Sequence, residues 1–108
     1  MLTADDLLAG SNGTFDLAIP PEILNPTREK ATDEEAIVRI KPLTIGAFQL
    51  IMKAAKSDPG LIPLLMIKEA VVEPALSIQQ VKQMHIGLVE FIVHHIRTIS
   101  GLTEKKSL

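Results

Sequence analysis

The sequence contains no cysteine, no tryptophan and no tyrosine, and phenylalanine occurs only three times in 108 residues. Without cysteine the chain has no disulfide, no catalytic thiol and no thiolate ligand for zinc. Because aromatic side chains are so few, the core must be mainly aliphatic. Apolar residues make up 46% of the chain. That fraction is enough for one compact core, and the length corresponds to one domain, with or without a tail.

Long apolar runs are also missing. The run over residues 61–67 contains Pro63, and the run that begins at Val89 is interrupted by Glu90. Neither approaches the roughly 20 residues that a helix needs to cross a bilayer. Residues 1–9 contain two acids and no base, unlike a secretory signal. We therefore expect a soluble, cytoplasmic chain that has no membrane partner.

Charge is distributed unevenly along the chain. Residues 1–35 contain eight acids and two bases, for a net charge of −6, whereas residues 36–108 contain nine bases and five acids, for +4. The first third also contains two glycines and three prolines. This pattern predicts an acidic, turn-rich N-terminal arm over 1–35, a helical body over 36–102 and a flexible tail over 103–108. The bases are scattered and have no interleaved aromatic residues, which disfavours a nucleic-acid partner.

Two segments have the pattern of short strands. Residues 15–19 alternate between apolar and other side chains and end before Pro20. Residues 36–43 are rich in β-branched residues, and Arg39 and Lys41 alternate with apolar neighbours. Together they predict a small N-terminal β-ribbon. A lone ribbon is marginal in water, so it must pack on helices.

From Thr44 onward the apolar period becomes helical. Thr44 is a candidate N-cap, and residues 58–60 (Asp-Pro-Gly) should end this first helix. Four apolar side chains then share one stripe at helical spacing: Phe48, Ile51, Met52 and Ala55. The next segment is apolar on nearly every side through Val71 and Val72, so we expect it to be the central helix.

A third helix should begin at Ser77, because Ser77 and Gln80 form a capping-box pattern. We expect His85 to share its apolar face. A final helix should end at Gly101, whose type suits the left-handed C′ position. The predicted fold class is therefore mainly α: three to four short helices with a short N-terminal β-ribbon.

Catalytic and metal-binding signatures are not found in the sequence. His94 and His95 are adjacent and would point about 100° apart on a helix, and His85 is nine residues earlier. Ser77 and Ser100 are better explained as helix ends than as nucleophiles, and no glycine-rich phosphate loop occurs. We expect no enzyme activity, no metal and no cofactor.

The apolar content exceeds what a core of this size readily hides. Part of the apolar helix surface should therefore stay accessible, and such a patch usually marks a protein interface. Methionine suits such surfaces because it adapts to varied partners, although it also fills gaps in cores. The candidate partner-binding residues are Phe48, Met52, Leu61, Leu65, Met66, Phe91 and His95.

Three segments carry a family resemblance: V-R-I-K-P-L-T at 38–44, L-L-M-I-K-E-A-V-V-E-P at 64–74 and I-R-T-I-S-G-L at 96–102. Their pattern resembles that of the tail assembly chaperones of long-tailed bacteriophages. It consists of a V-x-x-L-T-type entry, a central I-x-E-A-x-V-E-P and a closing I-x-x-I-S-G-L. The resemblance covers about residues 36–102. It consists of helix caps and core positions, so it implies a fold more directly than a chemistry.

The resemblance implies a small, mostly helical chaperone in the host bacterial cytoplasm. Such a protein would bind the tape measure protein and keep it soluble during tail assembly; the tail tube protein and a second copy of the chain remain open as further partners. The family has no catalytic residues to carry over. The alternatives are a small structural protein of the tail or head that stays in the virion, and a helical transcription regulator.

Overall fold

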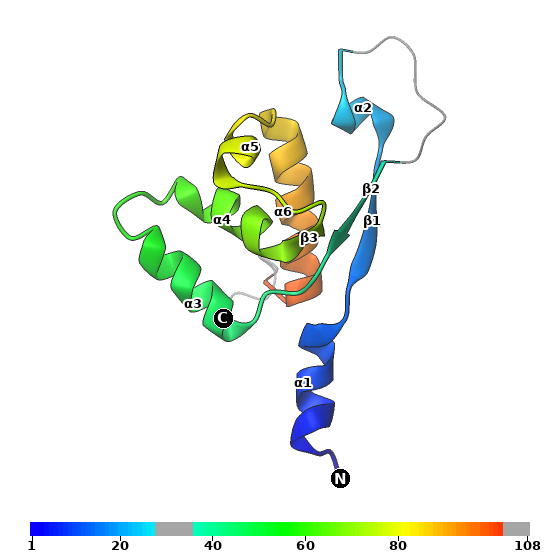
Figure 1. Ribbon diagram of the computed structural model, residues 1–108, viewed down its shortest axis with the longest axis vertical. Helices are drawn as coiled ribbons and strands as arrows, with labels where there is room; N and C mark the ends of the chain where they lie inside the picture. The colour runs from blue at the N-terminus through cyan, green and yellow to red at the C-terminus, as the bar shows by residue number, and fades with distance from the viewer. Residues whose placement is uncertain (28–35, 103–108) are drawn as a thin grey trace.

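The computed structural model describes residues 1–27 and 36–102, which form six helices and three strands (Figure 1). The predicted tail, 103–108, lies outside the described residues, as does the last part of the predicted arm, 28–35. In chain order the elements are α1 (Ala4–Asn12), β1 (Phe15–Ile19), α2 (Pro21–Leu24), β2 (Ala36–Ile40), α3 (Ile45–Ala54), α4 (Leu61–Ala70), β3 (Val71–Glu73), α5 (Ile78–Lys82) and α6 (Ile86–Ser100).

The molecule is helical with a small antiparallel sheet, so the predicted class is confirmed only in outline. The four helices α3 to α6 fall within the predicted body, and the predicted ribbon is present as β1 and β2. Two helices, α1 and α2, and the third strand, β3, were not predicted. The fold therefore combines α and β structure more evenly than the sequence pattern indicated.

The sheet has the order β1-β2-β3, with both pairs antiparallel. Phe15 lies opposite Ile40 and Leu17 lies opposite Val38. One face of the sheet packs on the helices, because Leu17, Ile19 and Ile40 are buried in the core. Strand β1 is therefore an integral part of the fold, although its sequence belongs to the predicted arm.

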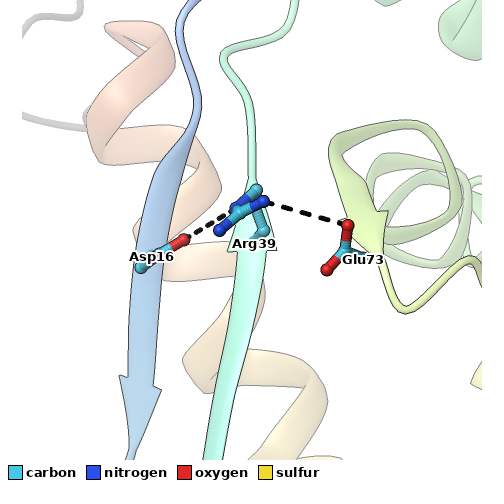
Figure 2. A network of polar contacts seen from close by, with 3 residues as sticks. All are labelled: Asp16, Arg39 and Glu73. Carbon is cyan, nitrogen blue, oxygen red and sulfur yellow. Dashed lines mark hydrogen bonds and ion pairs between the residues drawn. The ribbon is translucent and has the colours of Figure 1, made fainter.

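The opposite face of the sheet carries a charge cluster that links all three strands. Arg39 on β2 lies between Asp16 on β1 and Glu73 on β3 (Figure 2). Its Nε donates to Asp16 Oδ1 at 2.9 Å, and its Nη1 is 3.8 Å from Glu73 Oε1. The hydrogen bond to Asp16, together with the charges of Asp16 and Glu73, raises the pKa of the Arg39 guanidinium. All three side chains are exposed, so solvent screens these ion pairs.

Helix α4 lies at the centre of the helical layer, as its all-round apolar sequence predicted. It packs against α3, α5 and α6, and in Figure 1 it lies between α3 and α6. Met66 and Ile67 on α4 meet Ile92 and Ile96 on α6 within one aliphatic core. The core is mainly aliphatic because the chain has so few aromatic residues.

Three predicted helix ends are confirmed. The Thr44 hydroxyl accepts from Ala47 N–H at 3.0 Å, and Ser77 and Gln80 form both hydrogen bonds of the capping box. At the end of α6, Gly101 has φ +80°, in the left-handed region. There Leu102 N–H donates to the Arg97 carbonyl at 2.7 Å, which completes a Schellman motif.

Two helical assignments were wrong. Val71 and Val72, predicted as the end of the central helix, instead belong to β3, because their backbone pairs with β2. His85, predicted on the face of the third helix, is the N-cap of α6: α5 ends at Lys82, and His85 Nδ1 accepts from Leu88 N–H at 3.3 Å. In both places tertiary contacts outweigh the local apolar pattern.

Candidate functional site

An open apolar groove lies between α3 and α4. It has a volume of about 480 Å³. We call it the α3–α4 groove and define it by its lining residues: Ala47, Leu50, Ile51, Ala54, Leu65, Lys68, Glu69 and Ile78. Six of these eight side chains are apolar. The groove therefore presents mainly hydrocarbon surface, with two charges at its edge.

Helix α3 forms one wall of the groove through a second apolar stripe. Residues 47, 50, 51 and 54 follow the i, i+3, i+4, i+7 spacing, just as the predicted stripe at 48, 51, 52 and 55 does, and the two share Ile51. The apolar face of α3 is thus wider than one neighbouring helix can cover. Ile51 is buried, whereas Leu50 remains 69% exposed at the groove. The stripe at residues 47, 50, 51 and 54 is the feature of the sequence from which this wall of the groove could have been predicted.

The other wall comes from α4 and α5. Leu65, Lys68 and Glu69 are related by i, i+3 and i+4 spacing on α4, and Ile78 is the first residue of α5. Glu69 Oε2 lies 3.9 Å from Lys41 Nζ. Lys68 has no carboxylate within 4 Å among the residues that the structure describes. At the edge of the groove the negative charge of Glu69 is therefore paired with Lys41, whereas the positive charge of Lys68 has no ion-pair partner among the described residues.

The structure divides the candidate residues predicted from the sequence. Leu65 lines the groove. Met52 is 43% exposed on α3, and Phe48 is half-buried against the core on the same helix. Leu61 is half-buried at the start of α4. Met66 is buried with 1% exposure, so its side chain belongs to the core and is inaccessible to a partner.

The remaining two candidates, Phe91 and His95, lie together on α6 and do not line the groove. Their ring centroids are 4.6 Å apart with the planes tilted by 56°. Both are half-buried. Burial lowers the pKa of the His95 imidazole, and the charge of neighbouring His94 contributes to the same shift. This pair is better described as a packed part of α6 than as part of the groove.

A second exposed apolar surface lies on α1. This helix precedes β1 and extends from the start of that strand away from the other elements (Figure 1), and none of its residues is buried. Leu7 is 72% exposed and Leu8 is 59% exposed. With Ala4 they share one side of the helix, which we call the α1 apolar face. The full helix was not predicted from the sequence, so this surface was missed.

Residues 1–27 and 36–102 contain neither a membrane-spanning helix nor a cluster of metal-binding side chains. No helix there is long and apolar enough to cross a membrane. No group of three or more histidine, aspartate or glutamate side chains gathers in a way that would hold a metal ion.

Comparison with known proteins gave no relatives: no protein-family model, no curated protein and no solved structure matches this chain.

Proposed function

We propose that this chain is a phage or prophage tail assembly chaperone that holds an amphipathic helix of the tape measure protein in the α3–α4 groove. The observation that carries the proposal is the groove itself, with Leu50 mostly exposed on a wall of closely spaced apolar side chains. A groove between two helices suits an apolar helix face, which inserts side chains at i, i+3, i+4 and i+7. The family resemblance of residues 36–102 supports the identity of the client.

The chemistry of the groove suits transient protection of a client rather than a reaction on it. Its contacts are hydrocarbon, and the charges of Lys68 and Glu69 are confined to the edge. Charges in such positions orient a bound helix and contribute little affinity. A long helical client offers many similar segments, so modest contacts by several chaperone copies add up along it. We place this activity in the cytoplasm of the host bacterium, with the tail tube protein as a later partner.

Co-expression with the tape measure protein of the same phage genome tests the proposal. The soluble fraction of the client should rise when this chain is present, and the two should co-purify. Leu50→Asp should remove most of this effect, because it places a charge against the bound apolar face. Leu24→Asp is the matched control: Leu24 is 42% exposed on α2, outside the groove. Both variants should unfold at the temperature of the unmodified chain.

Two results would contradict the proposal. A client that is equally soluble with and without this chain would remove the chaperone function. Equal effects of Leu50→Asp and Leu24→Asp would remove the groove as the binding site. Mass spectrometry of purified virions distinguishes the alternative, because a structural tail or head protein stays in the particle whereas a chaperone leaves it.

A further inference from the structure

Helix α1 has a capped N-terminal end, but none of its residues is buried among the residues that the structure describes. Asp6 N–H donates to Thr3 Oγ1 at 3.2 Å, and Thr3 N–H donates to Asp6 Oδ2 at 2.9 Å, which forms a complete capping box. Yet helices shorter than about 12–15 residues are marginal in water unless an apolar face is packed. Helix α1 has nine residues, and all its leucines are exposed. Because nothing in residues 1–27 and 36–102 buries its apolar face, the helix needs a further surface on which to pack.

We propose that the α1 apolar face of one copy occupies the α3–α4 groove of a second copy. The groove is the complementary element: it is a helix-sized apolar surface that lacks a helix. The lengths agree, because the nine residues of α1 span about 13.5 Å and the α3 wall from Ala47 to Ala54 spans about 12 Å. Each copy has one helix to donate and one groove to receive it, so two copies related by a two-fold axis satisfy both contacts at once in a reciprocal dimer.

The charges of the two surfaces also match. Residues 1–27 contain acids and no base at all. Asp5 lies three residues before Leu8, so it borders the α1 apolar face, whereas Asp6 is held on another side by the capping box. Across the contact, Lys68 is the edge charge without a carboxylate within 4 Å among the described residues. Asp5 of one copy is therefore the natural partner of Lys68 of the other.

The helix is poorly placed to fill the groove of its own chain. Only Gly13 and Thr14 separate α1 from β1, and β1 is fixed in the sheet by its pairing with β2. From that position α1 extends away from α3 and α4 (Figure 1). A second copy meets no such restriction. The dimer contact does not depend on the client, although it would compete with a client helix for the same groove.

The first test measures the mass of the purified full chain by light scattering over a range of concentrations, without any client. We expect a dimer that dissociates on dilution. Leu7→Ser with Leu8→Ser should weaken the dimer by about tenfold or more, because it removes the two apolar side chains that the groove buries. The control Leu24→Ser removes an exposed leucine from α2 and should leave the dimer intact. A chain that stays monomeric at every concentration would overturn the proposal.

Charge exchange tests the predicted pairing of the two surfaces. Asp5→Lys and Lys68→Glu should each weaken the dimer, and the doubly substituted chain should recover it. Neither side chain is buried or makes a hydrogen bond among the described residues, so both variants should fold. Two single losses without recovery would show that these residues do not face each other in the dimer.

The cysteine-free sequence allows a direct proximity test. A copy with Ala4→Cys is mixed with a copy of different mass that carries Ala47→Cys, at the end of the α3 wall nearest Lys68, and the mixture is oxidised. A disulfide between the two copies supports the placement of α1 of one copy in the groove of the other. In the control, Leu24→Cys replaces Ala4→Cys, and this copy should form no such disulfide. A disulfide found only within a single chain that carries both substitutions would place α1 in its own groove instead.

The variants also separate this inference from the proposed function. Leu7→Ser with Leu8→Ser should abolish the dimer but leave client solubilisation intact or improved, because the groove is then vacant. Leu50→Asp should remove both. A variant that loses only the dimer therefore reports on the contact of α1 with the groove of the second copy. A chain that dimerises but does not solubilise the client would contradict the chaperone function and leave the α1 contact in place.

Discussion

The imidazole of His85 joins the start of α6 to the carbonyl of Ile23, 62 residues earlier, with Nε2 2.7 Å from the carbonyl oxygen. Because a carbonyl only accepts, Nε2 must carry the hydrogen, and Nδ1 is then free to accept from Leu88 N–H at 3.3 Å. One neutral tautomer satisfies both bonds. His85 therefore acts as the N-cap of α6 and as the link that holds α2 against this helix.

Substitutions at His85 separate these two roles. His85→Asn keeps an oxygen that can cap α6 but is too short to reach Ile23, so we expect a loss of about 0.5–1 kcal/mol in unfolding free energy. His85→Ala removes both bonds and should cost about 2 kcal/mol. Urea unfolding measures both values.

Hydrogen exchange localises the effect of His85→Asn. The amides of Leu24 and Asn25, which bond to the carbonyls of Pro20 and Pro21, should exchange faster in this variant, whereas amides of α4 should not change. Equal exchange of the α2 amides in both proteins would show that the Ile23 link does not hold α2.

Ser100 provides a second long-range link. Its Oγ accepts from Leu43 N–H at 2.8 Å, which joins the segment after β2 to the end of α6 in a partly buried position. Ser100→Ala leaves this N–H without its partner and should cost about 1–2 kcal/mol of unfolding free energy, whereas Ser100→Thr should retain most of it. Equal stability of the three proteins in urea would show that water replaces the hydroxyl at no cost.

Local signals in the sequence were sufficient for much of the fold. The caps at Thr44 and Ser77 and the glycine at 101 were predictable because each depends on residues within one turn. Strand β3 was not predictable in this way. Val71 and Val72 continue the apolar run of α4, and only pairing with the distant β2 makes them a strand.

The candidate site was predictable only in part, for a similar reason. The broad apolar pattern of α3 is present in the sequence, and Leu65 was identified from the separate apolar segment that forms α4. However, Leu50 and Met66 differ in one decisive property, exposure to solvent, which depends on where α3 and α6 pack around α4. Ile78 enters the groove from another helix altogether. Spacing along one helix cannot indicate either fact.

The lowered pKa of His95 predicts a pH dependence of stability. Since the folded state disfavours the charged imidazole, the unfolded state binds a proton first as the pH falls below the ordinary value of 6.5. The His95 contribution should therefore be complete above that value and decline below it. His95→Gln should reduce the difference in unfolding free energy between about pH 7.5 and about pH 5. His94→Gln is the control for the loss of a charge alone, and a larger reduction by this control would assign the dependence to His94.

Truncation at the N-terminus distinguishes α1 from β1. The sequence pattern predicted an acidic arm over residues 1–35 separate from the helical body, but Leu17 and Ile19 are buried at 4% and 5% exposure. Removal of residues 1–13 takes away no buried side chain, so the unfolding free energy of the monomer should change by less than about 0.5 kcal/mol. Removal of residues 1–20 also deletes two core side chains and the partner of β2, and should cost about 4 kcal/mol or more. Urea unfolding at a concentration where the chain is monomeric measures both. A cooperative transition at an unchanged midpoint in the shorter chain would show that β1 is a dispensable arm after all.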